Sequence, residues 1–564
     1  MILKKFLLLF FCFMFIINFF SCSNQNFSQS AYLEINLNEP RRHGFSVTQN
    51  QPLEIFQVIE KAASDDNIRG IILNIGSFNG DRDYLWEIRS ALEKFKSGGK
   101  KIVAFFSFAD MDSYLLASVA DQIVMDELGM LNITGYSMGR GYVKNMLEKL
   151  GIGVKELRYF EYKSAGEMYT RDSFSEADKK QYSDYLDDIF HFSKDILMKA
   201  RNWTDEDFND VINKEFLYSA KNALSRNLID HIGRSDVVLD VINEIEETVI
   251  NNFVLFGNSS NSLTNASGNY SASRGSGGSP IIAVVYAEGQ TDMEMGMAAL
   301  NLSNIIKNLA DTKKVAAIVL RINSPGGSAE AADYINEAVR YARLFKPVVV
   351  SMGSVAASGG YWAAMNASHI VCNPYTITGS IGVIASWLYD DGFSSKIGFN
   401  TDVIKRGDHS DLYTGFLVPY RNLTALEEDR YKQNILDLYS TFTKKVTIGR
   451  VMDINDVEAA AQGRIFSGIR ALEIGLVDSI GGLSDAITVA RNIADIDDNK
   501  RLNFRKYPQP TFMEKLLQNL SSVSGGKQIK TENILIDLIL PDTDIQYRII
   551  KSGQVMPILP LDTY

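Results

Sequence analysis

Cysteine and histidine are scarce in this sequence of 564 residues. The three cysteines, Cys12, Cys22 and Cys372, are too few for a disulfide scaffold. The five histidines show neither H-x₃-H nor H-E-x-x-H spacing, and these spacings are typical of zinc ligands. The sequence therefore predicts neither a metal site nor a cofactor.

Positive charge is not in surplus either. The chain has 57 lysines and arginines against 68 aspartates and glutamates, a net charge of −11. This balance argues against nucleic acid as a main partner, because binding to phosphates needs a basic surface. Beyond the N-terminus no apolar run reaches the roughly 20 residues of a membrane span, which excludes a polytopic membrane protein. The length, against about 150 residues per domain, predicts at least two large domains.

Residues 1–22 have the features of a targeting segment. Lys4 and Lys5 precede an apolar run over residues 6–20, and Ser21 and Cys22 follow it. Three interpretations remain open: a lipoprotein signal with lipid on Cys22, an uncleaved signal anchor, and secretion without an anchor. In each of them the lysines hold the N-terminus inside, so we expect the body of the protein outside the cytoplasm. The first two interpretations also attach it to the cell membrane, by lipidated Cys22 or by the N-terminal segment, and this is the localisation we expect.

The chain contains an internal repeat. GIILNI at residues 70–75 resembles AIVLRI at 317–322, and YLLASVADQIV at 114–124 resembles YWAAMNASHIV at 361–371, both at a separation of 247 positions. Further along, LYSAKNAL at 217–224 matches IFSGIRAL at 465–472 at a separation of 248. So long a period indicates a duplicated domain rather than a coiled coil or a short solenoid repeat.

These matches divide the chain into five parts. After the targeting segment we predict an N-terminal repeat over residues 23–250, a linker over 251–280, a C-terminal repeat over 281–500 and a tail over 501–564. The linker is predicted because residues 257–280 are rich in serine, asparagine and glycine and have almost no large apolar side chain.

Apolar, β-branched runs alternate with helical patterns in each repeat. Such runs are typical of strands buried on both faces of a sheet, so the expected fold class is α/β in two tandem domains. In the second repeat we expect strands over residues 281–286, 315–322 and 347–352 and helices over 302–309 and 329–345. A charged helix is expected over residues 175–200 of the first repeat, and another over 511–520 of the tail.

Glycine and serine gather just after the strands of the second repeat, at residues 323–327, 354–361 and 378–382. Any one of these clusters is explained by a tight turn. Three of them indicate a site, because glycines at strand ends let backbone N–H groups approach a developing oxyanion. Ser358, followed by Gly359 and Gly360, is the candidate nucleophile.

The repeat identifies a base for that serine. At the separation of 247, Ser358 corresponds to Met111, so the first repeat has no nucleophile. Conversely, Lys163 of the first repeat corresponds to Ser410 of the second. Such complementary losses are expected if one site forms across the two repeats. Burial would lower the pKa of Lys163 and make it a base. Glu161 and Glu167 would raise that pKa if they faced the lysine, so they are expected to point outward.

Other candidates were weighed against this pair. Ser137 lies in a G-x-S-x-G sequence, but the strand, helix and His–Asp partners that such a nucleophile needs are not evident. His409 and Lys405 are rival bases near the position that corresponds to Lys163. Cys372 ends a strand and is expected to pack in the core.

The sequence resembles the long form of signal peptide peptidase A, a family of membrane-bound Ser–Lys proteases with a Clp-protease/crotonase-like fold. The resemblance covers residues 68–494, and its motifs are highly specific as a set. The matching motifs are IIAVVYA at 281–287, IVLRINSPGG at 318–327, ASGGY at 357–361, TGSIG at 378–382 and YKSA at 162–165.

The resemblance implies a role for each site residue. Ser358 would be the nucleophile, Lys163 the general base, and Ser380 a hydroxyl that orients the lysine. The oxyanion hole would consist of the N–H groups of Gly359 and of Gly326 or Gly327. The family's long form is a homotetramer that degrades signal peptides and other hydrophobic peptides at the membrane without a cofactor.

Two other functions stay open at this point. A non-catalytic scaffold of the same fold could assemble at the membrane, but the retention of both Ser358 and Lys163 argues against it. An acyl-CoA enzyme of the crotonase class shares the oxyanion chemistry, but it needs no serine nucleophile and works in the cytoplasm. The sequence leaves open whether the Ser–Lys pair forms within one chain or between two.

Overall fold

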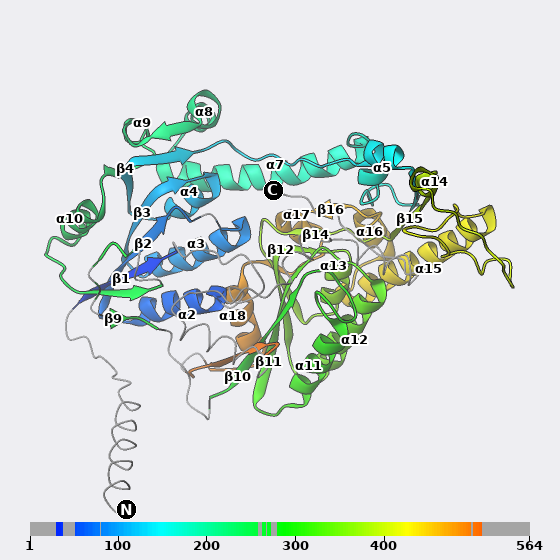
Figure 1. Ribbon diagram of the computed structural model, residues 1–564. Helices are drawn as coiled ribbons and strands as arrows, with labels where there is room; N and C mark the ends of the chain where they lie inside the picture. Colours follow the sequence, from blue (N-terminus) through cyan, green and yellow to red (C-terminus); the bar gives the residue numbers. More distant parts are fainter. Residues whose placement is uncertain are drawn as a thin grey trace, which may run out of the picture.

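Two α/β halves make up the computed structural model, which describes residues 30–37, 51–78, 80–257, 262–264, 266, 268–271, 279–497 and 500–509. Figure 1 shows the first half, in blue to green, beside the second, in green to orange. The α/β class and the tandem duplication predicted from the sequence are confirmed. Cys22, the targeting segment and the expected helix over residues 511–520 lie outside the described residues.

The first half is built on a mixed sheet with the strand order β6-β4-β3-β2-β1-β8-β9, and β7 pairs with β4. Its central strands are parallel and almost completely buried, because helices cover the sheet. The strands are β1 (Ala31–Asn36), β2 (Ile68–Gly76), β3 (Lys101–Ala109), β4 (Gln122–Asn132), β6 (Leu217–Ser219), β7 (His231–Ile232), β8 (Phe253–Phe256) and β9 (Gly268–Asn269). The helices are α2 (Gln51–Ser64), α3 (Arg82–Ser97), α4 (Met111–Ala117), α5 (Lys144–Leu150), α6 (Glu167–Thr170), α7 (Glu176–Arg201), α8 (Asp205–Asp210), α9 (Ala220–Ser225) and α10 (Ser235–Glu246).

The second half repeats this plan with the strand order β16-β14-β12-β11-β10-β18. Its strands are β10 (Ile281–Glu288), β11 (Val315–Ser324), β12 (Val348–Ala357), β13 (His369–Cys372), β14 (Ile377–Gly379), β16 (Ile465–Phe466), β17 (Ser479–Ile480) and β18 (Asn503–Tyr507). Its helices are α11 (Ala299–Asp311), α12 (Ala329–Arg343), α13 (Gly359–Ala364), α14 (Phe393–Ile397), α15 (Ala425–Arg450), α16 (Ile454–Ala460), α17 (Gly468–Glu473) and α18 (Leu483–Ile493).

The expected elements of the second repeat are present, and several extend further than the sequence indicates, β12 the most at its C-terminal end. β12 runs to Ala357, five residues beyond the expected end at Met352. Its first part pairs with β13, and residues Val355 to Ala357 pair with β14. The Gly353-Ser354 step conceals this continuation in the sequence, because glycine and serine are typical of turns. The extension places Ser358 immediately beyond the strand.

The segment over residues 251–280, for which the sequence favours a linker, contributes two strands to the first sheet. β8 pairs in parallel with β1, and β9 pairs with β8. Glu34 on β1, which is fully buried, accepts hydrogen bonds from the Leu263 and Thr264 amides. These contacts anchor part of the segment to the first half.

The duplication extends to individual side-chain contacts. The Tyr114 hydroxyl donates to the Leu228 carbonyl at 2.6 Å, and the Tyr361 hydroxyl donates to the Leu476 carbonyl at 2.9 Å. The carboxylate of Asp478 accepts from the Ile370 amide and pairs with Arg450 at the end of α15. Asp230 makes the corresponding contacts in the first half, with the Ile123 amide and with Arg201 at the end of α7.

The halves pack against each other as one body. One hydrophobic core joins residues of α2 and α3 to α18 and to one face of the second sheet. An additional two-stranded sheet crosses between the halves, where β5 (Ile152–Arg158) of the first pairs antiparallel with β15 (Ile384–Asp390) of the second. Helix α7 runs along both halves (Figure 1). Among the described residues, no helix has the length and apolar character needed to cross a membrane.

Candidate active site

Ser358 stands at the junction of β12 and α13, where its backbone is strained. Its φ is +54°, in a region that side-chain-bearing residues rarely adopt, and its amide donates to the Gly379 carbonyl at 2.9 Å. The side chain is fully buried. The glycines that follow are required by close packing, because a Cβ on Gly360 would lie 2.6 Å from the Ser324 carbonyl oxygen. Strain of this kind is found where the surrounding structure fixes a functional side chain.

Lys163 reaches Ser358 from the other half of the chain. It follows β5, and its Nζ lies 2.8 Å from the Oγ of Ser358. The same Nζ donates to the carbonyl oxygen of Ser380 at 2.8 Å and to its Oγ at 2.9 Å. The structure therefore brings together, within one chain, the three side chains that the sequence singled out. Lys163 and Ser358 are 195 positions apart in the sequence.

Burial lowers the pKa of Lys163 well below its ordinary value, because desolvation penalises the ammonium ion. The side chain is 1% exposed, and within the described part of the chain no carboxylate contacts its nitrogen. Glu161 is exposed, as expected. The expectation that Glu167 points outward is wrong in part. Glu167 is fully buried, but it turns away from Lys163 and pairs with Arg158 at 2.6 Å. The ion pair stabilises the buried carboxylate in place of water.

Backbone from the second half holds Lys163 in place. The Tyr162 amide donates to the Gln462 carbonyl, and Gly463, at a φ of +82°, packs directly against the lysine. A Cβ on Gly463 would lie 2.5 Å from the Cβ of Lys163. Sequence reasoning missed these two residues. The only available signal was an isolated glycine before a short strand, which is common in loops.

Ser380 is also held by this loop. It follows β14 at a φ of +49°, and its amide donates to the Arg464 carbonyl at 2.7 Å. The hydroxyl and the carbonyl of Ser380 thus accept hydrogen bonds from Lys163. In the uncharged amine this leaves the nitrogen lone pair directed at Ser358. An uncharged amine in this position can take a proton from the serine hydroxyl.

The glycines predicted for the oxyanion hole lie next to Ser358. A Cβ on Gly359 would lie 3.2 Å from the Cα of Gly326, so the two strand-end turns are in contact. Gly359 is the first residue of α13, where N–H groups lack partners in the helix. The Gly326 amide donates to the Ser324 Oγ at 3.3 Å, whereas the Gly327 amide donates to no other described residue. Of the two amides, that of Gly327 is thus the one without an acceptor among the described residues.

The rival residues lie in other settings. Ser137 lies in an extended segment that leads to α5 without a strand-to-helix elbow. His409 and Lys405 contact Glu427 and Asp411, respectively. Cys372 is completely buried in the second core, as expected, and burial raises the pKa of its thiol to about 12. No group of three or more possible metal ligands occurs within the described ranges.

Comparison with known proteins gives consistent results. The family model described as Peptidase family S49 matches residues 94–249 and 342–497, one match in each half. A chloroplastic serine protease named SPPA from Arabidopsis thaliana is 30% identical over 508 residues, which cover 87% of this chain and 74% of the relative. Protease 4 of Haemophilus influenzae is 29% identical over 78% of this chain and 73% of its own length. Protease 4 of Salmonella typhi is 29% identical over 84% of this chain and 76% of its own length.

Proposed function

Because this chain belongs to peptidase family S49 and is a serine endopeptidase, we propose that it cleaves peptide bonds with a Ser–Lys dyad. Ser358 is the nucleophile and Lys163 is the general base. The observation that carries this proposal is the 2.8 Å contact between the Lys163 Nζ and the Ser358 Oγ, where both side chains are buried.

Acylation follows from this geometry. The lone pair of the neutral Lys163 nitrogen accepts the Ser358 proton as the Oγ attacks the peptide carbonyl carbon. The resulting oxyanion accepts hydrogen bonds from the amides of Gly359 and Gly327, with Gly326 alongside. When the C–N bond breaks, the Lys163 ammonium returns the proton to the leaving amine. An ester between Ser358 and the acyl part of the substrate remains.

Deacylation uses the same groups in reverse. Lys163 takes a proton from a water molecule, and the resulting hydroxide attacks the ester carbonyl. The second oxyanion collapses, the acid product leaves, and the Ser358 Oγ recovers its proton from Lys163. Ser380 accepts hydrogen bonds from Lys163 throughout the cycle, and this keeps the lysine lone pair aligned with the Oγ.

We propose signal peptides and other hydrophobic peptides as substrates, and attachment of the body to the outer side of the cell membrane. The resemblance described above and the sequence of residues 1–22 support this assignment. Lipid on Cys22 is proposed as the anchor. Mass spectrometry of the mature N-terminus tests it, since a lipoprotein begins at a diacylated Cys22 whereas a signal anchor retains Met1.

Assembly into a homotetramer is proposed as well. A difference between the repeats supports association. Leu157 on β5 is 2% exposed where it packs on the second half, whereas its counterpart Ile404 is 90% exposed. Phe399, the counterpart of the buried Ile152, is 38% exposed. Exposed apolar side chains of this kind are typical of protein interfaces. Light scattering of the purified protein measures the assembly.

Substitution of the nucleophile tests the proposed function. Ser358→Ala removes one oxygen and leaves the packing intact, so the variant is expected to fold normally and to lose hydrolysis of a fluorogenic hydrophobic peptide. Ser137→Ala is the matched control and is expected to keep the wild-type rate. Hydrolysis by folded Ser358→Ala at the wild-type rate would overturn the assignment of Ser358 as the nucleophile. A scaffold function would instead be favoured if the folded wild-type protein hydrolysed no peptide.

A further inference from the structure

One face of α7 docks on the second half of the chain. The Asp184 carboxylate pairs with Arg464, and the Tyr185 hydroxyl donates to the Tyr375 carbonyl at 2.7 Å. One turn further along, Asp188 accepts from Ser467. Gln181 begins this face, because positions three, four and seven residues apart lie on the same side of a helix. The helix therefore belongs to the first repeat by sequence and contacts both repeats in space (Figure 1).

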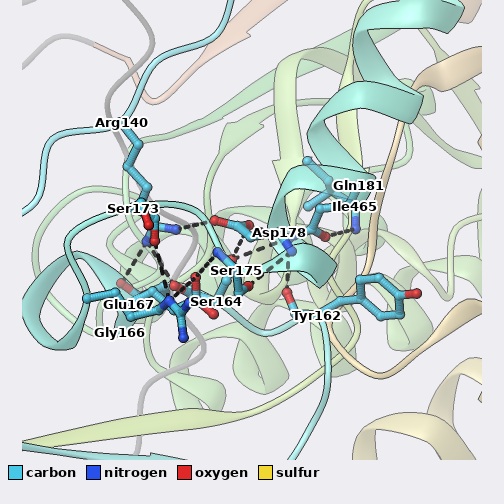
Figure 2. Close-up of polar contacts among 12 residues, drawn as sticks. Arg140, Tyr162, Ser164, Gly166, Glu167, Ser173, Ser175, Asp178, Gln181 and Ile465 are labelled. Atoms are coloured by element: carbon cyan, nitrogen blue, oxygen red, sulfur yellow. Dashed lines mark hydrogen bonds and ion pairs between the residues drawn. The ribbon is translucent and has the colours of Figure 1, made fainter.

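Gln181 bonds to both halves at once. Its Nε2 donates to the Tyr162 carbonyl at 3.1 Å and to the Asp178 carboxylate at 2.7 Å, and its Oε1 accepts from the Ile465 amide at 3.1 Å. The side chain is 2% exposed, and Figure 2 shows it between these groups. The amide of Gln181 combines an NH₂ group, which donates to two acceptors, with an oxygen that accepts from a third group. No other side chain of this length can make all three hydrogen bonds.

The two ends of this bridge lead to the two sides of the site. Tyr162 and Ser164 flank Lys163, and Gln181 also lies within 3.3 Å of the Ser164 Oγ. Ile465 belongs to β16, which pairs with β14, and the Ser380 amide bonds to the neighbouring Arg464 carbonyl. One end of Gln181 therefore bonds to the residue before Lys163. The other end bonds to the residue after Arg464, whose carbonyl holds the Ser380 amide.

Comparison of the two repeats indicates that this bridge is specific to the site. The capping residues Ser175 of α7 and Thr424 of α15 correspond to each other, which makes Arg430 the counterpart of Gln181. Arg430 is exposed. A buried amide is thus present in the repeat that supplies the lysine and is absent from the repeat whose equivalent position is Ser410.

We propose that Gln181 is a positioning residue that holds Lys163 in reach of Ser358 by bonding the two halves together. This inference rests on the proposed function. Gln181 touches neither reacting atom, so it acts through the backbone on each side of the lysine. Displacement of a catalytic group by about 1 Å can cost about 10²-fold in rate, so a bridge of this kind affects turnover.

The charged groups around this bridge are paired with each other. Asp178 pairs with Arg140 at 2.8 Å, as Figure 2 shows, and Asp184 pairs with Arg464 at 2.6 Å. The Arg464 guanidinium also lies over the Tyr162 ring. Glu167 pairs with Arg158. None of these groups bonds to the Lys163 nitrogen. Loss of the Gln181 side chain takes one donor from Asp178, which keeps its pairing with Arg140, and it takes a partner from the Tyr162 carbonyl and from the Ile465 amide.

Two substitutions test the inference in the full-length protein. Gln181→Met keeps the length and helix preference of the side chain but removes all of its hydrogen bonds. Gln181→Glu keeps an acceptor for the Ile465 amide, loses the donor to Tyr162 and to Asp178, and places a second carboxylate beside that of Asp178. For both we expect kcat to fall about 10-fold or more with KM within about twofold. The pH at which activity rises should move up by about one unit, because a loosened lysine gains water.

Tyr185→Phe is the matched control. It removes a hydrogen bond between α7 and the second half, one helical turn after Gln181 on the same face. The Lys163 segment is left untouched. We expect its kcat and pH profile to match the wild type, with melting temperatures measured for all variants. Equal losses in Tyr185→Phe and Gln181→Met would show that α7 only docks the halves and would overturn the inference. Wild-type kcat and pH profiles in Gln181→Met and Gln181→Glu would overturn it as well.

The same assay separates this inference from the proposed function. Lys163→Ala is measured beside the Gln181 variants. If Lys163→Ala hydrolyses peptide at the wild-type rate, the dyad itself is wrong, whatever the Gln181 variants do. If Lys163→Ala is inactive and Gln181→Met is fully active, the dyad stands and only the positioning role fails.

Discussion

The two halves have the same plan of sheet and helices and matching buried hydrogen bonds, yet they differ at the positions proposed for catalysis. The second half has Ser358 where the first has Met111, and the first has Lys163 where the second has Ser410. The segment that carries Lys163 includes β5, which crosses to the second half, whereas the counterpart of β5 over residues 399–405 forms no strand. The scaffold is therefore present twice, whereas the proposed site is present once and takes residues from both copies.

The largest expected effect is on the lysine that only the first half has. Lys163→Ala should lower kcat at least about 10²-fold, the lower range for loss of a general base. Lys163→Arg should be equally poor, because a guanidinium stays protonated and cannot accept the serine proton. Steady-state hydrolysis of a fluorogenic peptide measures both.

The counterparts in the second half are the controls for that result. Lys405→Ala and His409→Ala should keep the wild-type rate, since both side chains contact carboxylates away from Ser358. Retention of activity in Lys163→Arg together with loss in either control would place the base in the second half.

The buried lysine also predicts how activity depends on pH. Its pKa is lowered by burial, and only the uncharged amine accepts the proton of Ser358. Below the lowered pKa, kcat/KM should therefore fall about tenfold per pH unit, and above it the rate should be constant. The rise should come below the pH range of an exposed lysine, near about 10.4. A rise only at the ordinary lysine pKa would show that Lys163 is hydrated.

Two glycines of the second half have similar backbone conformations but different surroundings. Both Gly463 and Gly398 have positive φ, at +82° and +74°. A Cβ on Gly463 would meet Lys163 at 2.5 Å, whereas a Cβ on Gly398 would meet nothing within 4 Å. Each alanine substitution should cost about 1 kcal/mol of backbone strain, but only Gly463→Ala should also displace the lysine and lower kcat, by about 10-fold or more. Similar kcat values in the two variants would contradict this account.

The smallest expected effect tests what the halves have in common. Tyr114→Phe and Tyr361→Phe each remove one buried hydroxyl from matching positions. Each should lower the free energy of unfolding by about 1–3 kcal/mol, because a buried carbonyl loses its donor. Urea denaturation of both variants measures the effect. A large difference between the two values would show that the equivalent contacts differ in energy.

The parts of this structure that follow a local pattern could be predicted from the sequence. Apolar runs gave the central strands, and the constant separation of 247 positions allowed Lys163 and Ser358 to be paired through their missing counterparts. The contacts that hold the lysine could not be predicted in this way. Gly463 reaches Lys163 from the other half, and Gln181 bonds to Ile465, which is 284 positions away. No local period encodes contacts at such separations. The extension of β12 was hidden for a different reason, since Gly353 resembles a turn residue.

The central claim is that one site forms from Ser358 of the second half and Lys163 of the first. The most direct test is the rate of labelling by a serine-reactive fluorophosphonate, with the modified residue identified by mass spectrometry in wild type, Lys163→Ala and Lys405→Ala. The account predicts an adduct on Ser358 in the wild type, an unchanged rate in Lys405→Ala, and a rate at least about 10²-fold lower in Lys163→Ala. An adduct on Ser137, or undiminished labelling of Ser358 in Lys163→Ala, would contradict it.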